Sequence, residues 1–454
     1  MLQKLSSLWN RIPSAWRFAL AAFLVARLAL TLWSFVVYWI FPVALQNLDL
    51  FGEPALTVFD LRTSERYAYS RAVGETTLTF RALDDQYMLD DQTGSVWSMR
   101  EGRAIQGNYA GTSLKPSAYA VENIFPYLGV PPSQNEALAL WQRFDTNWYL
   151  RIAAYGYQGL AGSTAYFPLY PILIRLLSFV IEPMIAAVLV SNIALFGVLV
   201  LLYRLVSRLA DEHAARRTLI YFLVFPTSFF FMAAYTESLF LLFATGSLSA
   251  ASRRHWRRAA ALGMLSALTR LQGILLFFPL LYMIWNENKN PSPRNIFLRA
   301  LPLVIIPAAT LAFFIFSNFS MITALQGNWH ASFVFPWANV WASITLLMSP
   351  DGGIIDTMNL IVTLGFIAMM FAIWKNLPVE YSLYSIVMLI TPLFRMNATQ
   401  PLVSMMRYAL AIFPAFMVFG FWGENKWVNR VIVYLSLALQ LYLSAQFILW
   451  GWVG

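Results

Sequence analysis

Long apolar runs separated by short polar segments dominate this chain. A transmembrane helix needs about 20 mostly apolar residues, and Lys and Arg gather at the cytoplasmic ends of such helices. Together these rules predict an all-α polytopic membrane protein with about 11 crossings, an internal N-terminus and an external C-terminus. The predicted spans cover residues 17–45, 184–206, 218–234, 237–252, 259–270, 272–285, 297–317, 355–374, 380–394, 405–422 and 431–450.

This pattern divides the chain into three parts. Residues 1–45 form a cytoplasmic N-terminus and the first span, and residues 46–183 form the first external loop. Residues 184–454 form the remaining transmembrane bundle, with a second external loop at about 318–354. Several predicted spans hold only about 14 to 17 apolar residues, fewer than a hydrocarbon core of about 30 Å requires, so neighbouring helices must shield them or they must line a cavity.

The first external loop contains two further elements. From about residue 55 to 110, apolar and polar residues alternate between turn-like GE, DD and TG pairs, which predicts a small β-rich insert. Residues 166–182 are apolar, but a crossing there would place the later basic segment RLVSRLADEHAARR outside. We therefore expect them to lie parallel to the membrane at the outer leaflet, with the Arg175 side chain extended toward the headgroups.

Composition agrees with a membrane protein and removes several functional classes. Of 454 residues, 59% are hydrophobic and 12% charged, whereas soluble domains have about 25% charged residues. The net charge of +9 comes from clusters between apolar runs, which indicates membrane topology and not nucleic-acid binding. Because there is no cysteine and the three histidines are far apart, disulfides and thiol nucleophiles are excluded and no metal site is expected.

Isolated ionisable residues gather on the predicted external side. Such groups are costly at a membrane and usually face cavities, so they predict one polar cavity open to the outside. The residues concerned are Arg143, Asp145, Arg151, Glu237, Arg270, His330, Arg395 and Arg407.

Some of these residues have a simpler structural explanation. Arg395 is expected to anchor a helix end at the lipid headgroups, as Arg175 does. Arg143 and Arg151 flank Asp145 closely enough for a structural ion pair with it. For Glu237, capping of a helix N-terminus and a functional role are equally compatible with the sequence.

Arg270 and Arg407 point more directly to function. Each lies against long apolar runs, where a guanidinium group requires an anionic partner. A lipid-linked phosphate would supply that partner, because arginine offers phosphate a planar bidentate donor set. A carboxylate such as Asp145 would then serve as the base for an acceptor hydroxyl. With arginine stabilising the leaving phosphate, the reaction needs neither a metal nor another cofactor.

Six blocks of sequence resemble one family of membrane enzymes. In chain order they are FDTNWYLRIAAYGY, AYFPLYPILIRLLS, FPTSFFFMAAYTESLFLLF, ALTRLQGILLFFPLL, ALQGNW and MMRYALAIFPAF. Together they cover roughly residues 140 to 420 and resemble the PIG-V-like mannosyltransferases, which include GPI mannosyltransferase II and belong to the GT-C superfamily of integral-membrane glycosyltransferases.

The resemblance implies inverting, metal-independent transfer of mannose from a polyprenyl-phosphate donor to a lipid or glycan acceptor. It implies that Asp145 is catalytic, and the arginines at 270 and 407 are assigned to the donor phosphate. Sugar or acceptor contacts are assigned to Tyr235, Glu237, Gln326, Trp329 and His330. We expect the active site to face outward from a prokaryotic plasma membrane, in contact with membrane lipids and without a nucleic-acid partner.

Alternatives remain at the level of the sequence. Asp49 and Asp60 lie nearer the first span than Asp145, which is preferred for its WYL context. A transporter or flippase of a lipid-linked or anionic solute would also use arginines, aromatic residues and broken helices, although it would place ionisable groups near the membrane midplane and on both faces. A structural subunit with an inactive site is a third reading.

Overall fold

The computed structural model describes residues 12–50, 53–63, 65–117, 127–159, 162–287, 292–328, 330–350, 352–397 and 399–453. Trp329, predicted to contact sugar or acceptor, lies outside them. The chain forms two compact units, each of which is described by itself. The first comprises Met1–Ala29, Ile152–Leu443 and Val453–Gly454, and the second comprises Leu30–Arg151 and Ser444–Trp452.

Five described helices are long and apolar enough to cross a membrane, which agrees with a polytopic membrane protein. They are α2 (Ser14–Ile40), α7 (Pro183–Leu209), the run Pro293–Phe316 made of α12 (Pro293–Ala300), η4 (Leu301–Val304) and α13 (Ile305–Phe316), α16 (Ile354–Asn376) and α20 (Lys426–Ile448). A sixth results if the bent pair Met405–Ala411 and Phe413–Trp422 counts as one span.

The predicted number of about 11 crossings is not confirmed. Several of the predicted spans correspond to helices of 10 to 15 residues, shorter than the roughly 20 that a full crossing requires. These helices are α8 (Glu212–Val224), α9 (Glu237–Ala251), α10 (Trp256–Ala267), α11 (Phe277–Asn286) and α17 (Val379–Leu393). Hydropathy counted their apolar residues correctly, but the polar segments between them interrupt the helical backbone.

Shorter elements connect these helices. They are α4 (Glu136–Ala139), α5 (Asp145–Tyr155), η1 (Ser163–Ala165), α6 (Leu169–Leu177), η2 (Ser228–Phe231), η3 (Leu271–Leu276), α14 (Ser320–Asn328), β10 (Ala331–Phe333), α15 (Pro336–Leu347), β11 (Arg395–Asn397), α18 (Met405–Tyr408), η5 (Ala409–Ala411) and α19 (Phe413–Trp422). Strands β10 and β11 pair antiparallel.

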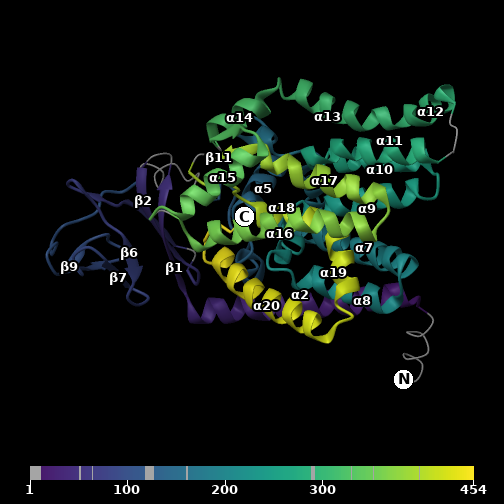
Figure 1. Cartoon of the computed structure of the whole chain (residues 1–454). Coiled ribbons are helices and arrows are strands. Elements are labelled where there is room, and N and C mark those ends of the chain that lie inside the picture. The colour runs from purple at the N-terminus through teal and green to yellow at the C-terminus, as the bar shows by residue number, and fades with distance from the viewer. Residues whose placement is uncertain are drawn as a thin grey trace. The chain divides into compact units, whose positions relative to one another are not determined.

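Close helix packing organises the first unit around α9 and α10, which lie side by side (Figure 1). Small residues permit this packing, as is usual between membrane helices. A Cβ added at Gly263 of α10 would lie 2.5 Å from the Ile306 side chain of α13. A Cβ at Gly197 of α7 would similarly lie 2.7 Å from Leu242 of α9. Both glycines therefore let neighbouring helices approach closely.

A sharp break separates α18 and η5 from α19. The two helical segments differ in direction by 81°. Pro414 lies in the first turn of α19 and cannot donate a helical hydrogen bond, while its ring excludes the carbonyl four residues earlier. The chain therefore leaves helical geometry at Ile412, where ψ is 62°. Broken helices at membrane depth are tolerated where protein or a cavity surrounds them.

The second unit contains small antiparallel sheets. A three-stranded sheet has the order β1-β2-β3, a two-stranded sheet pairs β4 with β5, and a four-stranded sheet has the order β6-β7-β8-β9. The strands are β1 (Val43–Leu50), β2 (Glu53–Asp60), β3 (Arg66–Ser70), β4 (Ala72–Val73), β5 (Thr76–Thr77), β6 (Phe80–Ala82), β7 (Tyr87–Asp90), β8 (Val96–Ser98) and β9 (Ala104–Gln106).

The central strand β2 is buried on both faces, which differs from the expected alternation of buried and exposed residues. Leu56 and Val58 pack into a cluster that includes Trp97, whereas Phe59 packs with Trp450 on the other face. The Phe59 and Trp450 rings stack with centroids 4.8 Å apart. The C-terminal residues 444–452 thus belong to the same unit as the sheets.

A buried carboxylate holds the turn after β7. Asp90 has no exposed surface and accepts hydrogen bonds from the Thr93 backbone at 2.6 Å, the Ser95 backbone at 3.1 Å and the Trp97 indole at 2.9 Å. Burial alone would raise the pKa of Asp90, but these hydrogen bonds, led by that from Trp97, outweigh it and lower the pKa below its ordinary value.

This arrangement predicts that acid weakens the insert. Because the folded pKa of Asp90 lies below the unfolded one, its stabilising contribution is present above the unfolded pKa and disappears as the pH falls through the folded pKa. At neutral pH, Asp90→Asn should lower the local free energy of unfolding by about 1–3 kcal/mol. Hydrogen exchange of residues 80–106 in the full chain, compared between neutral and strongly acidic pH, measures the effect.

Asp91→Asn is the matched control, since Asp91 forms only an exposed ion pair with Arg81 at 3.0 Å. The control should exchange like the wild type. Equal protection of Asp90→Asn and wild type at neutral pH would contradict the prediction.

Candidate functional site

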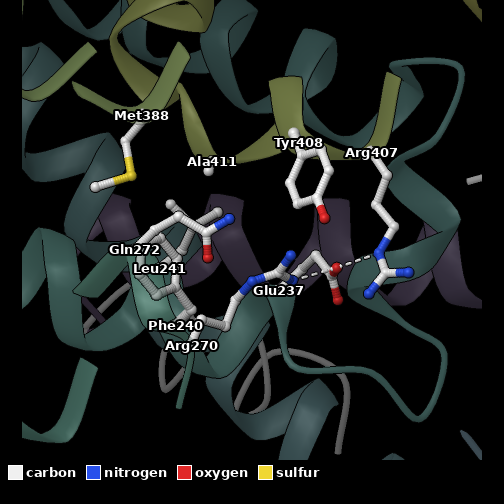
Figure 2. A pocket seen from close by; sticks show the side chains of 9 residues that line it. All are labelled: Glu237, Phe240, Leu241, Arg270, Gln272, Met388, Arg407, Tyr408 and Ala411. Atoms are coloured by element: carbon white, nitrogen blue, oxygen red, sulfur yellow. Dashed lines mark hydrogen bonds and ion pairs between the residues drawn. The ribbon is translucent and has the colours of Figure 1, made fainter. Parts of the chain in front are cut away.

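Three charged side chains from distant parts of the sequence meet inside the first unit. Glu237 begins α9, Arg270 precedes η3 and Arg407 lies in α18. Their side chains are 4%, 14% and 9% exposed, respectively. Figure 2 shows the Glu237 carboxylate between the two guanidinium groups. The required anionic partner of both arginines is therefore the same glutamate.

Both arginines bind one oxygen of that carboxylate. Glu237 Oε1 accepts a hydrogen bond from Arg407 Nε at 2.6 Å and another from Arg270 Nη1. Arg270 Nη1 also donates to Thr236 Oγ1 at 3.3 Å. Glu237 Oε2 is buried, and none of the described residues donates a hydrogen bond to it. The carboxylate is thus an ion-pair partner of both arginines with one buried acceptor oxygen left over, and it makes no side-chain cap on α9.

A narrow pocket adjoins this cluster. Sequence reasoning missed two of its polar residues, Gln272 and Tyr408, although both lie within two residues of the predicted arginines. Their proximity in sequence was a usable signal, but the direction of their side chains depends on the fold. Figure 2 shows the lining residues, which are Glu237, Phe240, Leu241, Arg270, Gln272, Met388, Arg407, Tyr408 and Ala411.

Aromatic rings fix the guanidinium group of Arg407. It lies 4.8 Å from the ring centroid of Tyr235 and 5.3 Å from that of Phe230. Both rings are almost completely buried. Cation–π contacts of this kind are worth up to about 2 kcal/mol when desolvated. Tyr235, which was assigned to sugar or acceptor, therefore supports an arginine in this structure.

Buried amides fix the backbone that leads to Arg407. Leu402 and Ser404 have φ values of 56° and 68°, a region that non-glycine residues seldom adopt. Asn339 Oδ1 accepts a hydrogen bond from the Leu402 N–H at 2.9 Å, and Asn359 Oδ1 accepts one from the Met406 N–H at 3.1 Å. The surrounding helices α15 and α16 thus impose an unusual backbone path immediately before the arginine.

Two arginines that were interpreted as headgroup anchors bind protein groups. Arg395 Nη1 donates to the hydroxyl of the pocket residue Tyr408 at 3.0 Å. Arg175 Nη1 donates to the carbonyls of Ala153 and Ala154 at 3.1 and 3.3 Å, in the last turn of α5. Arg395 therefore adds a third positive charge near the pocket, whereas Arg175 complements the negative end of a helix dipole.

An apolar groove of about 540 Å³ lies close to the charged cluster. Leu268, at the end of α10, lines the groove, and Arg270, two residues later, lines the charged pocket. The groove is lined by Ile152, Gly156, Tyr157, Pro168, Pro171, Ile172, Arg175, Leu268, Ala309, Ala312, Phe313 and Phe316. An apolar and a cationic compartment are thus adjacent along one short segment.

Comparison with known families bears directly on this site. Residues 126–283 match the family described as Mannosyltransferase (PIG-V). This match covers about a third of the chain and supports the resemblance to the PIG-V-like mannosyltransferases found in the sequence. No curated protein and no solved structure matches the chain.

The match covers a continuous part of this PIG-V-like chain that contains Asp145, Tyr235, Glu237 and Arg270. It includes α9, α10 and the groove residues from Ile152 to Leu268. Arg407 lies beyond the matched residues, and its assignment to the site follows from its bond to Glu237. The matched segment thus supports a membrane glycosyltransferase and carries four of the eight predicted site residues.

Asp145 belongs to the second unit of this PIG-V-like protein. Its carboxylate is half-buried in the first turn of α5. The neighbouring Arg143 is 2% exposed, donates from Nε to the Ile448 carbonyl at 2.8 Å and lies 4.6 Å from the Trp450 ring. Arg151 donates from Nη1 to the Leu128 carbonyl at 3.2 Å. Both flanking arginines therefore bind backbone carbonyls within this unit.

Two of the predicted sugar or acceptor residues lie away from the charged pocket. Gln326 is exposed on α14, and His330 is exposed just before β10. Neither is among the described residues that line the pocket. Their roles in this PIG-V-like chain remain predictions from the sequence.

Proposed function

We propose that this chain transfers mannose from a polyprenyl-phosphate donor to a lipid or glycan acceptor, with inversion at the anomeric carbon. The reaction takes place at the external face of a prokaryotic plasma membrane. The observation that carries the proposal is the adjacency of an apolar groove and a buried arginine cluster in a chain that matches a mannosyltransferase family. A polyprenyl phosphate combines the same two properties in one molecule.

The chemical step requires a base and a stabilised leaving group. The acceptor hydroxyl oxygen attacks the anomeric carbon from the face opposite the phosphate, and the bond between that carbon and the phosphate oxygen breaks. The bonding electron pair leaves with the polyprenyl phosphate, and the hydroxyl proton moves to Asp145. Asp145 is proposed for this role because it is the acid of the FDTNWYL block and falls inside the segment that matches the family.

The arginine cluster is proposed to bind the donor phosphate. Arg270 and Arg407 are both close to fully buried, where charge-assisted hydrogen bonds are strong. Among the described residues, the polar bonds of Arg270 leave only from Nη1, so its Nε and Nη2 remain as donors for a ligand. Together with Arg395 the cluster has three arginines against one glutamate, which leaves positive charge for an incoming phosphate.

Glu237 is proposed to have two functions. Through Oε1 it holds both arginines in place, and through the buried Oε2 it accepts a hydroxyl of the sugar or acceptor. A buried acceptor without a partner is costly, and a ligand hydroxyl would remove that cost. This arrangement also explains why a carboxylate can lie beside a phosphate site without a net negative charge.

The apolar groove is proposed to hold the first isoprene units of the donor. Its side chains come from α5, α6, α10 and α13 and are almost entirely apolar. Leu268 of the groove lies two residues before Arg270 of the charged pocket, so the tail and the phosphate of one polyprenyl phosphate are proposed to bind on either side of this short segment.

This placement predicts that filling the groove selectively impairs use of long-chain donors. Ala312→Trp should raise the KM for polyprenyl-phosphate mannose about 10-fold or more, because two or three methylene groups lose their burial at about 0.8 kcal/mol each. The kcat should change little, since the lost contacts are the same in the ground and transition states. Initial rates over a range of donor concentrations give both constants.

Leu311→Trp provides the control, because Leu311 is the preceding residue of α13 and does not line the groove. It should leave the KM unchanged. A short-prenyl donor should also be less sensitive to Ala312→Trp. Equal KM values for the two tryptophan variants would show that the polyprenyl tail of the donor does not bind in this groove.

The proposed activity is tested directly with purified full-length protein. Incubation with radiolabelled polyprenyl-phosphate mannose and a membrane lipid extract should move the label into a new lipid or glycan product. Absence of any labelled product although the donor binds would overturn the proposal. Movement of intact donor across vesicle membranes without transfer would instead favour a carrier.

A further inference from the structure

A second charged pocket lies at the other end of the α9–α10 pair. Glu237 begins α9 and Arg270 follows α10, so their cluster marks one end of the pair. The segment RRHWRR, which forms the turn after α9 and the first residues of α10, marks the other end. The 15 residues of α9 place the two ends about 22 Å apart at 1.5 Å per residue.

This turn has an unusual backbone conformation. Arg254 has a φ of 62°, in the left-handed region where glycine is favoured at the end of a helix. Its N–H donates to the Ala251 carbonyl at 2.7 Å, and the His255 N–H donates to the Ala250 carbonyl at 3.0 Å. An arginine in this conformation costs about 1–2 kcal/mol, so its side chain must offer a compensating contact.

That contact is a buried carboxylate. Glu287 follows α11 and its side chain is 7% exposed. Its Oε1 accepts from Arg254 Nε at 2.9 Å, and its Oε2 accepts from Arg299 Nη1 at 2.5 Å. Each oxygen of Glu287 therefore binds one arginine, and the carboxylate links the turn to α12.

The two arginines and their neighbours line an open cavity of about 440 Å³ at the surface. It is lined by Arg254, His255, Trp256, Arg257, Arg258, Leu298, Arg299 and Pro302. Four arginines thus line the cavity, against the single carboxylate of Glu287. The side chains of Arg254 and Arg299 remain 70% and 41% exposed, so they can reach a ligand as well as Glu287.

The surroundings of the cavity identify the kind of anion. Helix α12 begins the membrane span Pro293–Phe316, so the cavity lies at the end of a span, at the depth of lipid headgroups. The apolar side chains of Phe297, Leu298 and Leu301 beside it are 65%, 53% and 54% exposed. A ligand with a negative headgroup and hydrocarbon chains would contact both features.

We propose that this cavity binds the phosphodiester headgroup of an anionic phospholipid. Basic pockets between membrane helices recognise such headgroups, and arginine suits them because its planar donor set binds phosphate oxygens in pairs. The acyl chains would lie along the exposed apolar side chains of α12 and η4. The site is independent of the proposed transfer reaction and lies at the opposite end of α9 from Glu237.

The test compares lipid retention by full-length protein reconstituted in nanodiscs of equal parts phosphatidylglycerol and phosphatidylcholine. After extraction into detergent, native mass spectrometry counts the bound phosphatidylglycerol molecules. The double variant R257A/R258A should retain at least about 10-fold less phosphatidylglycerol than wild type, because charge-assisted hydrogen bonds contribute about 1.5–3 kcal/mol each. The control R204A/R208A removes two exposed arginines of α7 and should retain the lipid normally.

Two further measurements distinguish a specific lipid-binding site from non-specific electrostatic attraction. R257K/R258K keeps the charge without the planar donor set and should retain clearly less lipid than wild type. Glycerophosphoglycerol, the headgroup without acyl chains, should not displace the lipid. Equal retention by wild type and either double variant at residues 257 and 258 would overturn the proposal. Displacement by glycerophosphoglycerol would show a site for soluble phosphodiesters and would also overturn it.

Discussion

Asp145→Asn is expected to reduce transfer about 10²- to 10⁴-fold, the usual contribution of a positioned general base. Asparagine keeps the shape of the side chain but cannot take up the acceptor proton. Asp145 lies in the first turn of α5 and is only half-buried, so the amide should be accommodated there. Donor binding should remain normal because the phosphate and tail contacts are proposed to lie elsewhere.

The measurement is an initial rate with radiolabelled donor, together with the equilibrium affinity for the same donor. Asp60→Asn is the matched control. Asp60 Oδ1 accepts hydrogen bonds from the backbone N–H groups of Arg62 and Thr63 at 2.8 and 3.0 Å, so its carboxylate stabilises a turn. Asp49→Asn completes the set of first-loop candidates. A wild-type transfer rate for Asp145→Asn would contradict the assignment of Asp145 as the base. A large loss of transfer rate in either of the other two variants would assign the base to that aspartate instead.

Arg407→Ala is expected to weaken donor binding about 10- to 100-fold, which corresponds to the loss of one charge-assisted hydrogen bond at about 1.5–3 kcal/mol. Arg407→Lys should recover only part of this affinity, because an ammonium group lacks the planar donor set. The bond to Glu237 and the packing on Tyr235 and Phe230 would also be lost in Arg407→Ala. Protein stability must therefore be followed as well as affinity.

Glu237→Gln separates the effect on binding from the effect on stability. It leaves two arginines without their shared carboxylate, so the ligand-free protein should be less stable. The donor phosphate would then neutralise the positive charge that Glu237 no longer pairs, and the donor-induced rise in Tm should be larger than in wild type. In Arg407→Ala the rise should be smaller. Changes of the same sign in both variants would contradict phosphate binding by the cluster.

The sequence predicted the chemical composition of the site better than its geometry. Arg270 and Arg407 were identified because each guanidinium lies against apolar segments, a property visible in a short window of sequence. Their common partner was not predicted, since Glu237 is 33 positions from Arg270 and 170 from Arg407. No local periodicity reports a contact over such a distance, and Gln272 and Tyr408 were missed for the same reason.

The number of crossings shows the same limit for the fold. Hydropathy measures how apolar a segment is, and it predicted spans wherever enough apolar residues occurred. It does not report whether the backbone stays helical for a full crossing, which is decided by prolines such as Pro414 and by packing against neighbours. The about 11 predicted spans therefore became five or six long helices and several shorter ones.

By itself, the sequence determined that this is a multi-pass membrane protein with the blocks of a mannosyltransferase family, because composition and short motifs are local properties. The tertiary structure decided which charges meet, that Tyr235 supports Arg407, and that Leu268, two residues before Arg270, lines an apolar groove. These features depend on the packing of helices from distant parts of the chain. Packing is a property of the whole fold, so no segment of the sequence contains it alone.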